Sequence, residues 1–312
     1  MGTGGTIAGR SLDASDHIDY VAGELEVAEL VQGIVGISCE YELLVEQVAQ
    51  VDSKDMSFAI WALLAERVSH FSKMEDVAGI VITHGTDTLE ETAYFLHALL
   101  GPEKPVVLTC AMRPASALSP DGPQNLRDAI TVAGSAGARG VVVVCAGVVH
   151  CAENVQKRHT YRMDAFGSGD AGPVAYVEDN RLRLVGNWPA AQAIRSYSAI
   201  ENIAKLKSAI AWPKVEVVMN YAGASGELVD ALVASGVQGL VLSGTGNGTV
   251  HHKLEAALKL AQASGIRVVR ATRCAEGRVL ALPGDIFESA NGLSPVKARI
   301  ALLLALMLPG FD

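Results

Sequence analysis

The sequence has little positive charge and no basic run. Its 312 residues include 25 Lys and Arg against 34 Asp and Glu, which gives a net charge of −9. Proteins that bind nucleic acid usually present a clustered basic face to the phosphates. We therefore expect no nucleic-acid partner.

Long apolar segments are also missing. The C-terminal run from Ile300 to Leu308 is shorter than the roughly 20 residues that a membrane-spanning helix needs. A leader with a basic start, an apolar centre and a small-residue cleavage site is not recognisable near Gly2. We therefore expect no membrane partner and a cytoplasmic location.

Cofactor and metal motifs are lacking too. None of the five cysteines (Cys39, Cys110, Cys145, Cys151 and Cys274) has metal-ligand spacing, and no His-Glu-x-x-His pair occurs. The turn from Gly2 to Ile7 has an isoleucine where a dinucleotide fingerprint needs its third glycine. We expect no cofactor and no metal, and we interpret Cys110 and Cys145, in apolar runs, as small core residues of a protein in a reducing compartment.

What the sequence does contain is an alternation of strand-like apolar runs and amphipathic helical stretches, which indicates βαβ units. The pattern predicts a two-domain α/β protein, with a larger N-terminal, mostly parallel sheet flanked by helices and a smaller C-terminal α/β domain. We expect domains at residues 1–190 and 213–312, joined by a linker at 191–212 where neither period is clean. The expected strands are 78–83, 106–111, 140–145, 214–220, 239–243 and 267–271, and the expected helices are 57–68, 89–100, 123–136, 226–235 and 251–264.

Two short polar segments of the sequence, which we call corners, are rich in threonine and glycine. Thr83-His84-Gly85-Thr86-Asp87-Thr88 lies between an apolar run and a helical pattern, where open α/β sheets bind their ligands. We interpret His84 as a packing residue. Gly2-Thr3-Gly4-Gly5-Thr6 forms a second corner, and together they offer hydroxyls and an acid for attack on a carbonyl.

The corner from Gly2 to Thr6 also leads to an expectation about the residues before it. Glycine-rich corners of this kind normally follow a buried strand, yet only Met1 stands before Gly2. We prefer the explanation that the start methionine is misassigned and that a strand of about six residues is missing.

Several motifs in order resemble the bacterial L-asparaginase and glutaminase-asparaginase family of threonine amidohydrolases. In the N-terminal part they are Thr6 in its glycine turn, Asp52-Ser53-Lys54-Asp55-Met56, Thr83 to Thr88 with Glu90-Glu91-Thr92, Ala111-Met112-Arg113-Pro114, Asp121-Gly122-Pro123 with Asn125-Leu126, and Lys157. In the C-terminal part they are Pro213-Lys214, Asn220-Tyr221-Ala222, Gly244 to Gly248 and Pro295-Val296-Lys297-Ala298-Arg299.

The resemblance implies a catalytic set for hydrolysis of the side-chain amide of L-asparagine, with L-glutamine as a second substrate. Thr6 matches the nucleophile that forms the acyl-enzyme, and Tyr20 matches a tyrosine on a flap that hydrogen-bonds it. Thr86, Asp87 and Lys157 match a second cluster, in which a lysine accepts a proton through a threonine hydroxyl and the acid positions the lysine.

The resemblance also implies residues that hold the substrate. Ser53 matches the contact to the substrate α-carboxylate, Lys54 stands beside it where many relatives have glutamine, and Asp87 matches the contact to the α-ammonium. Asn247 matches a residue that a neighbouring subunit contributes, so a homodimer, or a homotetramer built of two dimers, is implied. An acidic residue from that subunit has two candidate counterparts, Glu276 and Asp285.

Two other functions remain open on the sequence alone. An amidase subunit that feeds ammonia to a partner would keep this chemistry, and a binding protein for an amino acid would keep the site without turnover. Ammonia release from asparagine by the parent and by Thr6 or Thr86 variants separates the three.

Overall fold

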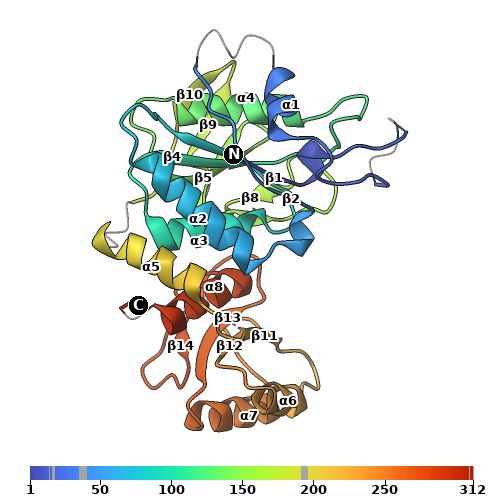
Figure 1. Cartoon of the computed structure of the whole chain (residues 1–312). Coiled ribbons are helices and arrows are strands. Elements are labelled where there is room, and N and C mark those ends of the chain that lie inside the picture. The colour runs from blue at the N-terminus through green and yellow to red at the C-terminus, as the bar shows by residue number, and fades with distance from the viewer. Residues whose placement is uncertain (14, 16–17, 35–40, 191–195, 309, 312) are drawn as a thin grey trace. The chain divides into compact units, whose positions relative to one another are not determined.

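The computed structural model describes residues 1–13, 15, 18–34, 41–190, 196–308 and 310–311, and Cys39 lies outside them. The chain divides into two compact units, Met1–Lys207 and Ser208–Asp312. Both units carry sheets and helices (Figure 1), so the predicted two-domain α/β fold is confirmed. In the described part of the chain, no helix is long and apolar enough to cross a membrane.

The larger unit is built on an eight-stranded sheet with the order β10-β9-β6-β5-β4-β3-β1-β2. Neighbours from β5 to β2 pair in parallel, whereas β6, β9 and β10 pair antiparallel. The strands are β1 Gly2–Gly4, β2 Gln47–Val51, β3 Ile80–Thr83, β4 Pro105–Thr109, β5 Gly140–Cys145, β6 Val148–Cys151, β9 Ala175–Glu178 and β10 Arg181–Leu184, and the pair β7 Gln156–Lys157 and β8 Phe166–Gly167 forms a separate two-stranded sheet.

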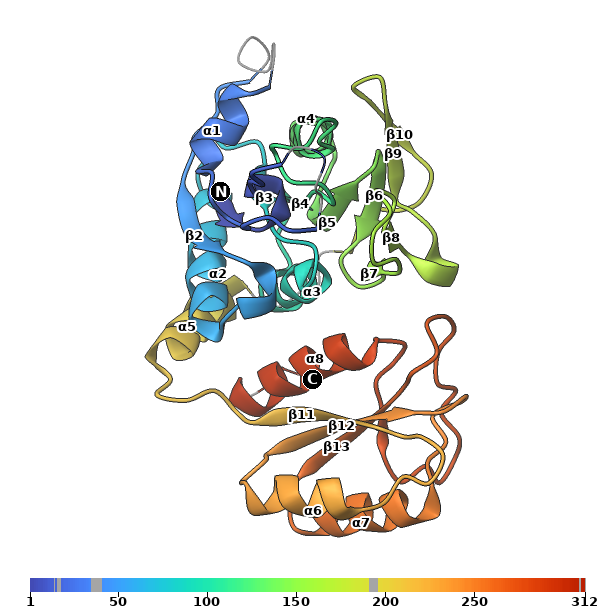
Figure 2. The same ribbon diagram turned by 90° about the vertical axis from the view of Figure 1, so that its right-hand side faces the viewer.

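Helices cover both faces of this sheet (Figure 2). Helices α1 and α4 lie on one face, and α2 and α3 lie on the other. Strands β4 and β5 are buried along their whole length, as expected for parallel strands packed between two helical layers. The helices of this unit are α1 Val27–Gln32, α2 Phe58–Ser72, α3 Leu89–Leu100, α4 Gly122–Ala133 and α5 Ser196–Ser208, with short 3-10 helices at Thr6–Ala8, Ser53–Asp55 and Gly169–Ala171.

Helix α5 lies inside the segment 191–212 that we expected to be a linker. Ile203 and Leu206 of this helix are buried, and Lys207 forms an ion pair with Glu66 of α2 at 2.8 Å. The helix therefore packs as part of the first unit. We expected a linker because the few apolar residues of this segment are mixed with many polar ones. Residues 191–195 lie outside the described residues.

The smaller unit has a four-stranded parallel sheet with the order β11-β12-β13-β14. Helix α8 packs on one face, and α6 and α7 pack on the other (Figure 2). A cluster of buried apolar side chains, mostly aliphatic, under α6 and α7 forms the core. The elements are β11 Val215–Met219, β12 Gly239–Gly244, β13 Arg267–Thr272, β14 Glu288–Ser289, α6 Glu227–Ala234, α7 His252–Ala263 and α8 Pro295–Met307.

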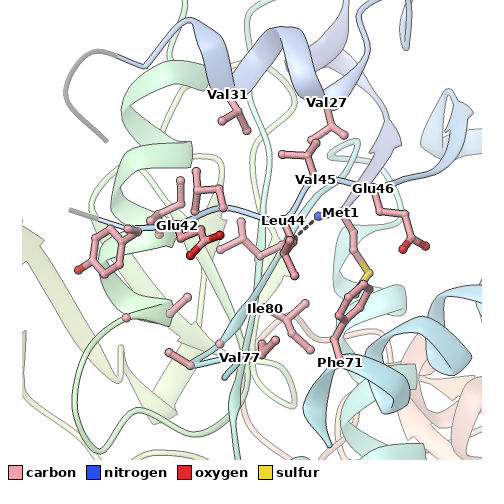
Figure 3. Close-up of a pocket in the computed structure, with 18 of the residues that line it drawn as sticks. Met1, Val27, Val31, Glu42, Leu44, Val45, Glu46, Phe71, Val77 and Ile80 are labelled. Carbon is pink, nitrogen blue, oxygen red and sulfur yellow. Dashed lines mark hydrogen bonds between the residues drawn. The ribbon is translucent and has the colours of Figure 1, made fainter. Parts of the chain in front are cut away.

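Strand β1 lies between β3 and β2, where we expected a buried strand before the glycine turn. It is three residues long. Met1 extends the pairing by one residue: its carbonyl accepts from the Thr83 N–H at 3.0 Å, and its terminal nitrogen donates to the Val81 carbonyl at 2.8 Å (Figure 3). The sheet is therefore complete at the carboxyl end of β1 and interrupted at the amino end.

Candidate active site

The two polar corners lie side by side at the carboxyl ends of the adjacent strands β1 and β3. Gly5 and Gly85 pack backbone to backbone, so closely that a Cβ on Gly5 would lie 2.2 Å from the Cα of Gly85. Gly5 also has a φ of +81°, which side chains other than glycine rarely adopt. Glycine at both positions therefore lets Thr6 and Thr86, the next residue in each corner, share one site.

Thr6 begins a 3-10 helix and is buried, and its hydroxyl contacts one aromatic residue. The Thr6 Oγ1 lies 2.6 Å from the Tyr20 hydroxyl. Arg10 and Val21 form an antiparallel bridge, and the neighbouring Tyr20 ring packs against Gly9, where a Cβ would lie 2.8 Å from the ring. The structure therefore brings together these two predicted residues.

Thr86, Asp87 and Lys157 form a second hydrogen-bonded cluster. The Lys157 Nζ donates to Thr86 Oγ1 at 2.8 Å and to Asp87 Oδ1 at 2.6 Å. Lys157 lies on β7, and its backbone N–H donates to the Glu90 carboxylate at 3.2 Å. Glu90 therefore ties the lysine strand to the start of α3, a positioning contact that the sequence analysis did not assign.

Ser53 completes the arrangement from a 3-10 helix after β2. Its hydroxyl accepts from the Asp87 N–H at 3.1 Å, and its carbonyl accepts from the Thr88 hydroxyl at 2.7 Å. The next residue, Lys54, points outward and pairs with Asp52 at 2.8 Å. Ser53 is thus held against the Thr86 corner, whereas Lys54 lies at the surface beside it.

His84 is buried under the corner within a chain of hydrogen bonds. Its Nδ1 lies 2.7 Å from the Gly85 carbonyl, and its Nε2 lies 2.9 Å from the Thr92 hydroxyl. The Trp61 indole N–H donates to that same hydroxyl at 2.9 Å, so Thr92 donates to Nε2 and the Nδ1–H donates to Gly85. Burial lowers the pKa of His84 from 6.5 to about 4. His84 is therefore a neutral residue that fixes the Gly85 peptide, which is more than the packing role we expected.

The Met112–Arg113 motif is held by Asp121, another part of the resemblance. The Asp121 carboxylate accepts from the backbone N–H groups of Met112 and Arg113, both at 3.0 Å. Asn125 donates to Asp121 at 3.2 Å and to the Cys110 carbonyl at 3.0 Å. These residues shape the loop after β4, beside β3.

The predicted residues of the smaller unit are used differently. Asn247 pairs with the backbone of Leu280 in both directions: Nδ2 donates to the carbonyl at 3.2 Å, and Oδ1 accepts from the N–H at 2.7 Å. Asp285 accepts from the Leu282 N–H at 2.7 Å and pairs with Arg270, and these contacts lower its pKa. Glu276 is exposed.

In the part of the chain that the structure describes, no group of three or more His, Cys, Asp or Glu side chains is placed to hold a metal ion. Cys110 and Cys145 are buried, and hydrogen bonding to Cys145 together with burial raises the pKa of Cys110. Cys110 is therefore an unreactive thiol in the core.

Comparison with known protein families finds a matching family model for each of the two units. A family model described as "Asparaginase, N-terminal" matches residues 1–190, and one described as "Glutaminase/Asparaginase C-terminal domain" matches residues 214–309. The chain is 35% identical to L-asparaginase 2 of Bacillus subtilis, over 98% of this chain and 81% of that protein. It is 34% identical to the glutaminase-asparaginase of Pseudomonas fluorescens, over 98% of this chain and 85% of that protein.

A solved structure is similar over the whole chain. The crystal structure of a probable cytoplasmic L-asparaginase from Campylobacter jejuni superposes with a TM-score of 0.90 at 35% identity, covering 100% of this chain and 94% of that one.

Proposed function

This chain belongs to the asparaginase family, and we propose that it hydrolyses the side-chain amide of L-asparagine to L-aspartate and ammonia through an ester on Thr6. The observation that carries the proposal is the pairing of two hydroxyl systems at adjacent strand ends. One is Thr6 with Tyr20, and the other is Thr86 with Lys157 and Asp87. The relatives named L-asparaginase and glutaminase-asparaginase support the same activity.

In the first step the Thr6 oxygen attacks the side-chain carbonyl carbon of the substrate. A threonine hydroxyl is a weak nucleophile at neutral pH and needs a proton acceptor beside it. Tyr20 is within hydrogen-bond reach of this hydroxyl at 2.6 Å. The C–N bond then breaks, the nitrogen takes up the proton that Thr6 released and leaves as ammonia, and an aspartyl ester remains on Thr6.

The charge that develops on the carbonyl oxygen needs a donor in a fixed position. The Thr86 backbone N–H donates to no protein acceptor among the residues that the structure describes. It therefore remains available to an oxyanion. In the second step water attacks the ester, and its proton passes through the Thr86 hydroxyl to Lys157. The bond between the acyl carbon and the Thr6 oxygen breaks, that oxygen takes up the proton again, and L-aspartate leaves.

The substrate's ends are held by groups around the Thr86 corner. Asp87 is half exposed and offers its carboxylate to the α-ammonium, while Ser53 offers its hydroxyl to the α-carboxylate. Lys157 donates to the same carboxylate at 2.6 Å, so a bound α-ammonium would share Asp87 with the lysine. Lys54, paired with Asp52, adds a cation on the carboxylate side.

A homodimer is the smallest active unit in this proposal, and a tetramer of two dimers extends it. Asn247 and Glu276 of a neighbouring subunit would then reach the substrate. The reaction draws on no cofactor or metal. The location that we propose is the cytoplasm. The similar protein from Campylobacter jejuni is named a probable cytoplasmic L-asparaginase, which supports this proposal.

Ammonia release from L-asparagine and L-glutamine by the purified protein tests the proposal, with Thr6→Val and Thr86→Val beside the parent. Mass spectrometry of quenched reactions should find an aspartyl adduct on the Thr6 peptide of the parent. Thr245→Val, which removes a hydroxyl of the smaller unit, is the matched control and should keep the adduct. A parent no faster than both catalytic-corner variants would favour an amino-acid-binding protein instead.

A further inference from the structure

Tyr20 reaches Thr6 from a segment whose apolar side chains are largely exposed. Two arms carry it: the outgoing arm, residues 9–13, leaves the 3-10 helix Thr6–Ala8, and the returning arm, residues 18–21, ends just after Tyr20. Leu12 on the outgoing arm is fully exposed, and Ile18 on the returning arm is 80% exposed. Because burial of these side chains contributes little, the position of Tyr20 depends on hydrogen bonds made by the two arms.

The two arms are bonded to each other. The backbones of Arg10 and Val21 exchange both of their hydrogen bonds, each at 3.0 Å. The Ser11 hydroxyl donates to the Asp19 carbonyl at 3.0 Å. That carbonyl belongs to the peptide that enters Tyr20, so the location of Tyr20 follows the location of Ser11.

The outgoing arm is bonded in turn to residues 110–121, the loop between β4 and α4. The Ala115 N–H donates to the Gly9 carbonyl at 2.9 Å. The Ser116 hydroxyl accepts from the Ser11 N–H at 2.8 Å. The first of these contacts is made by backbone alone, whereas the second depends on one side-chain oxygen. Ser116 is therefore two hydrogen bonds away from the peptide that enters Tyr20.

The loop between β4 and α4 is itself fixed, as a support for the arm needs to be. Asp121 accepts from the N–H groups of Met112 and Arg113 at the start of this loop, both at 3.0 Å. The Ala117 N–H donates to the Pro114 carbonyl at 3.0 Å, and both residues are buried. Ser116 lies between these two residues and Asp121, so its hydroxyl is presented from a well-anchored turn.

The contact that this support serves is sensitive to small displacements. The Tyr20 hydroxyl lies 2.6 Å from Thr6 Oγ1. Lengthening this separation by about 1 Å would take the pair out of hydrogen-bond range. Misplacement of a reacting group by about 1 Å can cost on the order of 10²-fold in rate.

We propose that Ser116 is a positioning residue for the reaction at Thr6. Its hydroxyl fixes the outgoing arm at Ser11, and the arm in turn sets the Tyr20 hydroxyl against Thr6. Ser116 acts through Tyr20 and does not act on the substrate. The proposal rests on the proposed function, in which Thr6 needs a proton acceptor beside it.

Amide hydrogen exchange without substrate tests the support directly. Ser116→Ala removes the acceptor for Ser11, Ser116→Thr keeps a hydroxyl there, and Ser119→Ala removes an exposed hydroxyl of the same loop as the matched control. Exchange at the Val21 N–H should quicken by about fivefold or more in Ser116→Ala and match the parent in the other two variants. Val21 exchange that is unchanged in Ser116→Ala would overturn the proposal.

A double-mutant cycle with Tyr20→Phe tests whether the effect passes through the Tyr20 hydroxyl. Ser116→Ala should lower kcat/KM for L-asparagine by about 3- to 10-fold in the parent, the range expected for one lost hydrogen bond. It should change kcat/KM by less than about twofold when Tyr20 is already phenylalanine, because the contact to Thr6 is then absent. A general structural defect would instead lower both backgrounds by the same factor.

The remaining variants complete this comparison. Ser116→Thr and Ser119→Ala should keep the kcat/KM of the parent within about twofold, and all variants should keep its melting temperature within a few degrees. Equal losses in the parent and Tyr20→Phe backgrounds, or no loss in the parent, would contradict the role of Ser116.

The two measurements separate this proposal from the proposed function. A parent that releases no ammonia would refute the proposed function, and Val21 exchange in Ser116→Ala would then decide alone whether Ser116 holds the arm. An active parent whose Ser116→Ala variant shows unchanged exchange and unchanged kcat/KM would keep the proposed function and refute the role of Ser116.

Discussion

Two strand-end corners of this chain both combine threonines with glycine, but their hydroxyls have different partners. Thr83 to Thr88 follows β3 in the larger unit, and Gly244 to Thr249 follows β12 in the smaller one. In the smaller unit the corner closes on itself: Thr245 and Thr249 exchange backbone hydrogen bonds at 2.9 and 2.8 Å, and their hydroxyls lie 2.9 Å apart. In the larger unit the Thr86 hydroxyl instead meets Lys157.

The difference shows that threonines and glycines at a strand end are not enough for chemistry. Thr86 gains a proton-transfer partner because β7 brings in a lysine 71 residues further along the chain. Among the residues that the structure describes, the Thr245 hydroxyl meets only neutral groups: Thr249 of its own turn, and the Asn220 amide at 3.0 Å. A corner becomes a candidate catalytic site when an ionisable side chain reaches it from another element.

The largest expected effect comes from removing one hydroxyl in each unit. Thr6→Val should lower kcat for L-asparagine by on the order of 10³-fold or more, because the variant has no oxygen to acylate. Thr245→Val should change kcat by less than about tenfold, because its hydroxyl is used within its own turn. Steady-state ammonia release on both variants measures this. Comparable losses in kcat would remove the distinction between the two corners.

The next effect tests the lysine that distinguishes the corners. Lys157→Met should lower kcat by about 10²- to 10⁴-fold, the usual range for removing a general acid or base. Lys157→Arg should not restore it, since a guanidinium stays protonated. Both variants should retain the melting temperature of the parent within a few degrees. An active Lys157→Arg protein would show that the residue supplies charge alone.

The elements around the Thr86 corner show how much of the fold and of the site could be predicted from the sequence. Helix α3 and strand β5 have the predicted bounds, because the apolar periods that specify them are local. The partners of Thr86 depend on contacts between distant residues, and only the resemblance indicated Lys157. The support that His84 gives to Gly85 could not be predicted, because Thr92 and Trp61 complete that chain of hydrogen bonds only when α2 packs against α3.

A smaller effect concerns the pH dependence of stability. Of the two corners in the described part of the chain, only the one in the larger unit has a buried imidazole, His84. His84 has a folded pKa of about 4 against 6.5 for the free side chain, so the unfolded chain binds the extra proton. Stability is then fully present above pH 6.5 and falls as the pH drops toward 4, by up to about 3 kcal/mol.

Denaturant unfolding at a series of pH values measures this slope. His84→Phe should unfold more readily at pH 8, because Gly85 and Thr92 lose a partner, and should lose this group's share of the slope between pH 6.5 and 4. A variant with the parent's slope would assign the acid sensitivity to other groups.

The smallest expected effect belongs to the corner of the smaller unit. Asn247→Ala removes both hydrogen bonds to Leu280 and should lower stability by about 1–2 kcal/mol, because the loop after β13 loses this attachment. Asn247→Asp keeps the acceptor for the Leu280 N–H and loses only the donor, so it should cost less. If Asn247 also reaches the substrate of a neighbouring subunit, KM for L-asparagine rises in the alanine variant while the aspartyl adduct on Thr6 still forms. Loss of stability with an unchanged KM would restrict Asn247 to holding its own loop.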